Sequence, residues 1–303
     1  MDGVGGASAL GSARFGLIGI GVVALLVALM VVSVWVVRHP LRGRRVACID
    51  DLLDLLPARP DAPTSRLRVG LGTRGVALAL GLAGLAVVVV LAVGFTALLD
   101  SVLEGEGLAE FDDPAAHWLA GHRELWLTQV LLVVTRMGNS DAQAAWIVLV
   151  CVVAAVRARS CFPVLVGMAG GGGIWLVIVI AKVLVGRQRP ALPYAVISVH
   201  GFSFPSGHAT GAAAVGMLCA WMLCRWVVRR WALQVLVWAV TIAMIALIGF
   251  SRPYLGVHFI TDVLAGWLLG AAWAAAVIVL ASSWLRVQPS ETSGQLQGPE
   301  GVG

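Results

Sequence analysis

Long uncharged runs of apolar residues alternate with short polar segments along almost the whole chain. A helix needs about 20 apolar residues to cross a bilayer, so such runs predict membrane-spanning helices rather than the helices of a soluble domain. The runs expected to span are 15–37, 75–99, 141–156, 162–185, 207–224, 231–250 and 258–281. The fold class predicted by this pattern is therefore all-α and integral to a membrane.

The segments outside these runs have different compositions. Residues 1–14 are rich in Gly, Ser and Ala and are expected to be disordered, as is the polar tail 283–303. The run 15–37 could instead be a cleaved signal peptide. A span is favoured because the run is too long for a signal core and because the basic cluster follows it. Residues 38–74 form an Arg-rich linker that several prolines interrupt.

The distribution of charge predicts how the chain crosses the membrane. The linker 38–74 contains eight Arg, whereas the segment 100–124 contains seven acidic residues and a single Arg. Because basic loops stay in the cytoplasm, the linker and the C-terminus are expected inside, and 100–124 outside. The run 125–134 is too short to cross. It predicts a helix that lies in the interface or dips into it and ends at Gly138 and Asn139.

Composition narrows the function classes further. The chain of 303 residues is 59% apolar and only 12% charged, which excludes an ordinary soluble domain. Its net charge of +5 does not indicate a nucleic-acid partner, because the basic residues follow the membrane topology. The five cysteines have neither metal-site spacing nor the pattern of a disulfide framework. No internal repeat is evident, which weighs against an inverted-repeat transporter.

Three short segments place polar residues where membrane helices begin or end, on the same expected outer face. The segment 251–262 reads SRPYLGVHFITD and opens the last span. Lys182, the only lysine of the chain, ends the fourth span, and Arg189 follows it closely. The tetrapeptide PSGH at 205–208 opens the fifth span. Ionisable groups at a membrane boundary are costly and therefore indicate a functional site.

The cationic residues of these segments suit a phosphate group. Lys182, Arg189 and Arg252 would supply positive charge, and Arg can bind two oxygens at once. The start of a helix at 205–208 offers free backbone N–H groups to an anion, and Gly207 allows close approach of the backbone. Taken singly, these arginines and Arg187 could also anchor lipid headgroups.

Two histidines and one carboxylate could provide nucleophilic and acid–base catalysis. His258 and Asp262 lie four residues apart on one helix face, so the carboxylate can hold one imidazole nitrogen while the other attacks. His208, from another helix, could protonate a leaving group. Taken alone, His258 could be a structural histidine and Asp262 a helix cap. The convergence of all three segments on one face favours the catalytic interpretation.

The spacing of these residues resembles the three-part motif of the type 2 phosphatidic acid phosphatase (PAP2) superfamily, in its membrane-bound bacterial lipid phosphatase branch. The matching positions are Lys182-(six residues)-Arg189-Pro190, Pro205-Ser206-Gly207-His208 and Ser251-Arg252-(five residues)-His258-(three residues)-Asp262. The resemblance covers residues 75–282. It implies a six-helix transmembrane core of the PAP2 type, preceded here by one extra N-terminal transmembrane helix.

The resemblance also implies roles for individual residues. His258 would be the nucleophile that forms a phosphohistidine, Asp262 its orienting partner, and His208 the general acid that later activates water. The residues implied to bind phosphate are Lys182, Arg189, Ser206, Gly207 and Arg252. Neither a metal nor another cofactor is implied.

The expected function is that of a phosphoric monoester or diphosphate hydrolase in a bacterial plasma membrane, with its active site on the extracytoplasmic face. The expected partners are the bilayer and a lipid phosphate: a polyprenyl (pyro)phosphate, phosphatidate or phosphatidylglycerol phosphate. Two alternatives are a lipid-linked phosphotransferase that uses the same site and a non-catalytic lipid transporter or binding protein. The span 15–37 could serve as an anchor, a homodimer contact or a regulatory element.

Overall fold

The computed structural model describes residues 64–190 and 194–287, and every regular element in these ranges is helical. The expected span 15–37, the linker before residue 64 and the tail beyond 287 lie outside the described residues. The helices, in chain order, are α3 (Thr64–Glu104), η1 (Gly107–Phe111), α4 (Asp112–Gly121), α5 (Leu125–Arg136), α6 (Ser140–Ala158), α7 (Phe162–Gly167), η2 (Met168–Gly172), α8 (Gly173–Val185), α9 (Gly207–Trp226), α10 (Trp231–Tyr254) and α11 (Ile260–Val287).

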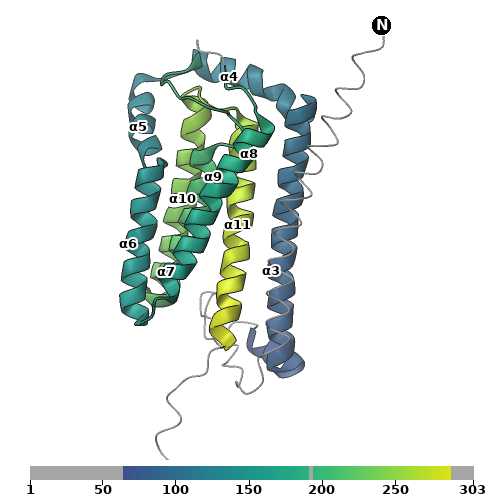
Figure 1. Ribbon diagram of the computed structural model, residues 1–303, viewed down its shortest axis with the longest axis vertical. Helices are drawn as coiled ribbons and strands as arrows, with labels where there is room; N and C mark the ends of the chain where they lie inside the picture. The colour runs from purple at the N-terminus through teal and green to yellow at the C-terminus, as the bar shows by residue number, and fades with distance from the viewer. Residues whose placement is uncertain (1–63, 191–193, 288–303) are drawn as a thin grey trace, which may run out of the picture.

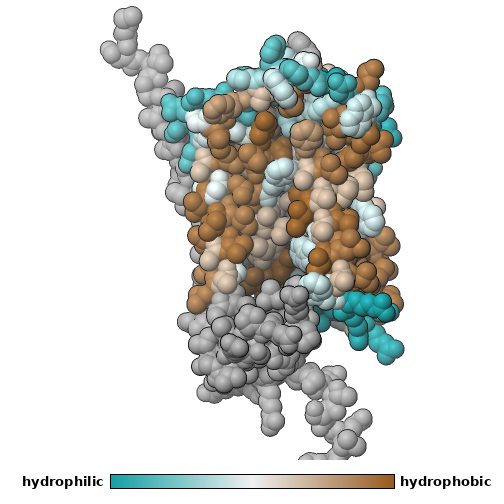
Figure 2. Space-filling model, turned by 180° about the vertical axis from the view of Figure 1, so that it is seen from behind, coloured by the Kyte–Doolittle hydropathy of each residue, from teal (hydrophilic) through white to brown (hydrophobic). Residues whose placement is uncertain are grey.

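Six stretches of helix in the described residues are long and apolar enough to cross a membrane. They are Gly81–Glu104, Ser140–Ala158, Phe162–Val185, Gly207–Trp226, Trp231–Tyr254 and Ile260–Leu285. They confirm the six spans predicted after the first one. Figure 1 shows them running along the long axis of the bundle, and Figure 2 shows a broad hydrophobic band between two more polar ends.

Two helices extend beyond the boundaries expected from the hydrophobic pattern. Helix α3 begins at Thr64, so residues 64–74 belong to a helix rather than to a linker. Helix α11 continues to Val287, so residues 283–287 are helical rather than part of the tail. The polar residue Ser283 does not end this helix, because its hydroxyl donates to Val279 O in the preceding turn at 2.7 Å.

The short apolar run after the acidic segment forms α5, which packs against α10. In Figure 1 it stands along the bundle axis, end to end with α6, and does not lie flat across the end of the bundle. The two helices are separated only by residues 137–139. Together α5 and α6 therefore resemble one interrupted helix whose break lies at the level of the candidate site.

Two glycines one helical turn apart bring α11 directly against α9. A Cβ at Gly266 would lie 3.0 Å from Ser206 O, and a Cβ at Gly270 would lie 2.3 Å from Thr210 O. Small residues at this spacing allow two membrane helices to approach to backbone contact. This contact fixes the start of α9 beside the start of α11, where the predicted site residues lie.

Gly270→Ala is expected to lower the thermal unfolding temperature. Its methyl group would meet backbone atoms of α9, which cannot rotate away, and overpacking of this kind costs about 1–3 kcal/mol. Gly81→Ala is the matched control, because no described residue has an atom within 4 Å of a Cβ at that helical position. Thermal unfolding of both variants in detergent measures the effect, and equal unfolding temperatures would contradict close α9–α11 packing.

Candidate active site

The predicted site residues come together at one end of the bundle. Lys182 lies near the end of α8, His208 in the first turn of α9, Arg252 near the end of α10 and Asp262 in the first turn of α11. His258 lies in the short turn between α10 and α11. Figure 1 shows α4 crossing this same end of the bundle. The structure thus brings together residues that span about 80 positions of sequence.

His258 and Asp262 form a buried pair. The side chains are 2% and 0% exposed, and Nδ1 of His258 lies 3.3 Å from Oδ2 of Asp262. Ser203 joins them, because its hydroxyl donates to Asp262 Oδ2 and lies 3.2 Å from His258 Nδ1. The amide of Phe259 donates to the same carboxylate oxygen at 2.9 Å. These bonds hold the carboxylate in place against the imidazole.

The contact with Arg189 identifies which ring nitrogen of His258 carries no proton. Its Nη1 lies 3.1 Å from His258 Nε2, and a guanidinium can only donate. Nε2 must therefore accept, and the ring proton is carried by Nδ1, toward Asp262. Burial lowers the pKa of His258 to about 3, although the nearby Asp262 carboxylate opposes this shift. An uncharged imidazole with an unprotonated Nε2 is the form that a nucleophile requires.

Three cations surround this histidine without a carboxylate partner in the described part of the chain. Lys182 Nζ donates to Phe202 O at 2.6 Å, and Arg189 Nη1 donates to Val257 O at 2.6 Å. Arg252, which is 2% exposed, donates from Nη1 to the hydroxyl of Thr135 at 2.7 Å. Backbone and hydroxyl oxygens orient these cations but do not neutralise them. The arrangement therefore suits an anion.

Buried polar atoms at the site indicate where oxygens of such an anion could bind. Ser206 Oγ and Arg252 Nε are both buried and have no hydrogen-bond partner among the described residues. A buried donor without a partner is costly, and a phosphate oxygen would satisfy it. The amide of Ser206 is used differently, since it donates to Asp262 O at 3.0 Å. A Cβ at Gly207 would make only ordinary contacts of 3.6 Å or more.

His208 is held from a different direction. Its Nε2 lies 2.9 Å from Asn139 Oδ1, at the break between α5 and α6. The ring is half-buried and lies against the backbone of that break, because a Cβ at Gly138 would be 2.7 Å from His208 Cδ2. His208 and His258 thus reach the same end of the bundle from separate elements.

Comparison with known proteins identifies the architecture. Residues 160–286 match the family model of the PAP2 superfamily. Phosphatidylglycerophosphatase B of Bacillus subtilis (strain 168) is 30% identical over 148 residues, which are 49% of this chain and 72% of that protein. The chain belongs to the PAP2 superfamily.

A solved structure of the same superfamily has the same fold. It is the crystal structure described as the first transmembrane PAP2-type phosphatidylglycerolphosphate phosphatase from Bacillus subtilis. The TM-score is 0.58 at 28% identity, over 63% of this chain and 94% of that one. The chain is therefore a multi-pass membrane PAP2 lipid phosphatase, a hydrolase of phosphoric monoesters.

Sequence reasoning missed an ion network behind the His258–Asp262 pair of this PAP2 protein. Arg187 Nη1 donates to Asp262 Oδ1 at 2.7 Å, and Nη2 donates to Asp112 Oδ2 at 2.7 Å. Asp112 is 3% exposed and also accepts the amide of Thr261 at 3.1 Å. Arg187 is thus an internal cation rather than a headgroup anchor. Asp112, which had appeared only as part of an acidic loop, fastens α4 to the start of α11.

Three further contact residues carried no sequence signal of their own. Ser203 holds Asp262, Thr135 holds Arg252, and Asn139 holds His208. A hydroxyl or amide side chain in a loop or apolar helix is too common to be singled out without its neighbours. Thr135 and Asn139 also lie before residue 160, outside the segment that matches the PAP2 model.

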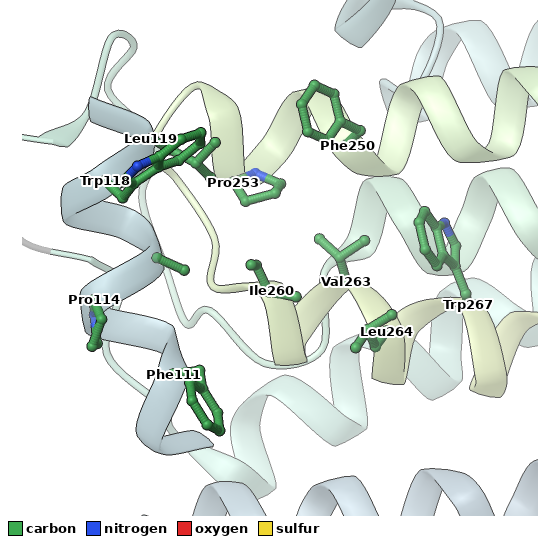
Figure 3. Close-up of a pocket in the computed structure, with 11 residues that line it drawn as sticks. Phe111, Pro114, Trp118, Leu119, Phe250, Pro253, Ile260, Val263, Leu264 and Trp267 are labelled. Carbon is green, nitrogen blue, oxygen red and sulfur yellow. The ribbon is translucent and has the colours of Figure 1, made fainter. Parts of the chain in front are cut away.

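A separate apolar groove of about 590 Å³ opens between α4, α10 and α11. Figure 3 shows its lining: Phe111, Pro114, Ala115, Trp118, Leu119, Phe250, Pro253, Ile260, Val263, Leu264 and Trp267. Asp262 is turned by about 200° from Ile260 around the axis of α11, as is Arg252 from Phe250 on α10. The groove therefore lies on the side of these helices away from Asp262 and Arg252 and is distinct from the candidate active site.

Proposed function

We propose that this protein removes the phosphate monoester of phosphatidylglycerol phosphate at the outer face of a bacterial plasma membrane, through a phosphohistidine at His258. The observation that carries the proposal is the buried His258, whose Nε2 faces Arg189 among cations that have no carboxylate partner among the described residues. The substrate is suggested by the name of the Bacillus subtilis relative and by the description of the solved Bacillus subtilis structure, each of which specifies a phosphatase of this lipid.

In the proposed first step, Arg189, Lys182 and Arg252 hold the non-bridging phosphate oxygens. Nε2 of His258 attacks phosphorus, the bond from phosphorus to the lipid oxygen breaks, and His208 gives that oxygen a proton. Asp262 accepts a hydrogen bond from Nδ1–H of His258 and so stabilises the positive charge that develops on the ring.

In the proposed second step, water replaces the lipid oxygen. His208 takes a proton from the water as its oxygen attacks phosphorus, and the bond to Nε2 of His258 breaks. Inorganic phosphate leaves, and His258 returns to its starting form. Both steps use only side chains that the structure brings to this end of the bundle.

Charge at the two ends of the bundle supports an outward-facing site. The end opposite the site carries Arg157 and Arg159 at the end of α6, and Arg229 and Arg230 between α9 and α10. Basic loops of this kind stay in the cytoplasm. The acidic residues of 100–124 lie at the end that contains His258, which suits the extracytoplasmic face. There, a lipid could present its phosphate while its tails stay in the bilayer.

A panel of phosphatidylglycerol phosphate, phosphatidate and a polyprenyl diphosphate tests the proposed substrate. The purified protein in detergent is expected to release inorganic phosphate, with the highest kcat/KM for phosphatidylglycerol phosphate. Radiolabelled phosphate that appears on an added alcohol rather than in solution would indicate a phosphotransferase. No turnover of any substrate would favour a transporter or binding protein.

Activity is expected to persist in excess EDTA. Lys182, Arg189 and Arg252 would provide the positive charge that a metal supplies in other phosphatases. The described residues include no group of three or more His, Cys, Asp or Glu that could hold a metal ion. The measurement is phosphate release before and after dialysis against chelator, and loss of activity that a divalent ion restores would contradict the expectation.

A further inference from the structure

The break between α5 and α6 contacts the candidate active site through Asn139, whose side chain bonds to a histidine of another helix. Asn139 occupies the N-cap position of α6 yet forms no capping hydrogen bond with its side chain. Asparagine at an N-cap normally accepts an N–H from the first helical turn. Here its Oδ1 instead lies 2.9 Å from Nε2 of His208 on α9. The side chain thus serves a residue 69 positions away rather than its own helix.

The surrounding turn fixes this contact in position. Gln143 Nε2 donates to Gly138 O at 2.8 Å, and the amide of Gln143 donates to Asn139 O at 3.0 Å. Both bonds anchor the turn to the start of α6. The absence of a side chain at Gly138 lets the ring of His208 lie against the turn. The imidazole is therefore confined between α9 and a turn that offers it one acceptor.

We propose that Asn139 is a positioning residue that selects which nitrogen of His208 exchanges a proton with the substrate. Its Oδ1 accepts a hydrogen bond from Nε2–H throughout the reaction, so that Nδ1 is the nitrogen that gives a proton to the leaving group and takes one from water. The inference rests on the proposed function, because it assigns the orientation of the general acid in that reaction.

The proton transfers follow from this orientation. In the first step His208 is protonated on both nitrogens, and Nδ1 gives its proton to the lipid oxygen as the bond from phosphorus to that oxygen breaks. His208 is then neutral, with its remaining proton on Nε2 and bonded to Asn139. In the second step Nδ1 takes a proton from the attacking water, the bond from phosphorus to His258 breaks, and the starting protonation returns.

Thr135 provides a matched comparison from the other side of the same break between α5 and α6. It lies one turn before Asn139, at the end of α5, and holds Arg252 through a hydrogen bond of 2.7 Å. Arg252 is proposed to bind phosphate oxygens and not to transfer protons. Loss of the Thr135 contact should therefore affect every phosphate substrate alike, whereas loss of the Asn139 contact should matter only where the leaving group needs a proton.

The test compares kcat/KM for two substrates, phosphatidylglycerol phosphate and p-nitrophenyl phosphate. An alkoxide needs a proton to leave, whereas p-nitrophenolate does not, and kcat/KM reports only the steps up to departure of the leaving group. General acid catalysis is worth about 10²–10⁴-fold, so Asn139→Leu is expected to lower kcat/KM for the lipid by roughly 10- to 100-fold. For p-nitrophenyl phosphate we expect a change below about threefold, because no proton is required.

Two further variants complete the experiment. Asn139→Asp keeps an acceptor oxygen in place and is expected to retain most of the activity on the lipid. Thr135→Val is expected to lower kcat/KM for both substrates by the same factor. Asn139→Leu removes no side-chain capping bond from α6. Thermal unfolding checks that this variant folds. If it does not fold, Asn139→Ala tests the same dependence on the leaving group.

The outcomes separate this inference from the proposed function. Equal losses on the two substrates, or no loss on either, would overturn the role of Asn139 while the wild-type activity stands. Wild-type protein that releases phosphate from neither substrate would overturn the proposed function itself, and the role of Asn139 with it.

Discussion

His258→Ala is expected to lower kcat for phosphate release from phosphatidylglycerol phosphate by at least about 10³-fold, because removal of a covalent nucleophile removes the chemical pathway. Nε2 of His258 is the accepting nitrogen beside Arg189, and Nδ1 is fixed by Asp262 and Ser203. No other imidazole of the described residues is held by a carboxylate. Steady-state release of inorganic phosphate by purified protein measures the loss.

The intermediate provides a second readout for the same variant. Wild-type protein quenched in alkali during turnover of ³²P-labelled lipid should carry label, because phosphohistidine survives alkali and is lost in acid. His258→Ala should carry none. His122→Ala is the control, because His122 is exposed at the end of α4, and its ring contacts Trp118 there, away from His258. A His258→Ala protein that releases phosphate at the wild-type rate would show that the nucleophile lies elsewhere.

The sequence alone predicted the six described spans and the residues that meet at one end of them. Both predictions rest on local information. Apolar length predicts each span, and the four-residue spacing of His258 and Asp262 predicts their contact. The expectation that both lie on one helix face was wrong, because His258 lies in the turn before α11 and only Asp262 lies in that helix. Lys182 and the 205–208 segment could be placed beside them because alternate crossings return the chain to the same face. Helix ends were less certain, since polar residues such as Ser283 can bond within the helix and continue it.

What the sequence could not show was how the site residues are held. Asp112 and Arg187 are 75 positions apart, and Asn139 and His208 are 69 apart. Such pairs depend on how α4, α5 and the loop after α8 pack over the bundle. The hydrophobic periodicity of the sequence does not predict that packing. The orientation of Asn139 even runs against its local preference to cap α6, so only tertiary structure reveals it.

The ion network behind Asp262 is the contact that most affects both stability and the site. Arg187 joins two carboxylates that are 3% and 0% exposed, and its guanidinium also lies 4.3 Å from the ring centre of Phe259. One cation thus compensates two buried acids and links α4 to α11. Removing a single partner from such a network leaves buried charge without compensation, which costs far more than a surface ion pair is worth.

Arg187→Met is therefore expected to destabilise the protein by about 3–5 kcal/mol and to abolish most activity, because both Asp112 and Asp262 lose their cation. Thermal unfolding in detergent, with phosphate release measured below the transition, checks both effects. Adding Asp112→Asn to this variant should recover part of the stability, since one uncompensated carboxylate becomes a neutral amide. It should recover less activity, because Asp262 would still lack the bond that fixes its Oδ1. Unfolding of Arg187→Met at the wild-type temperature would mean that Arg187 does not stabilise these buried acids.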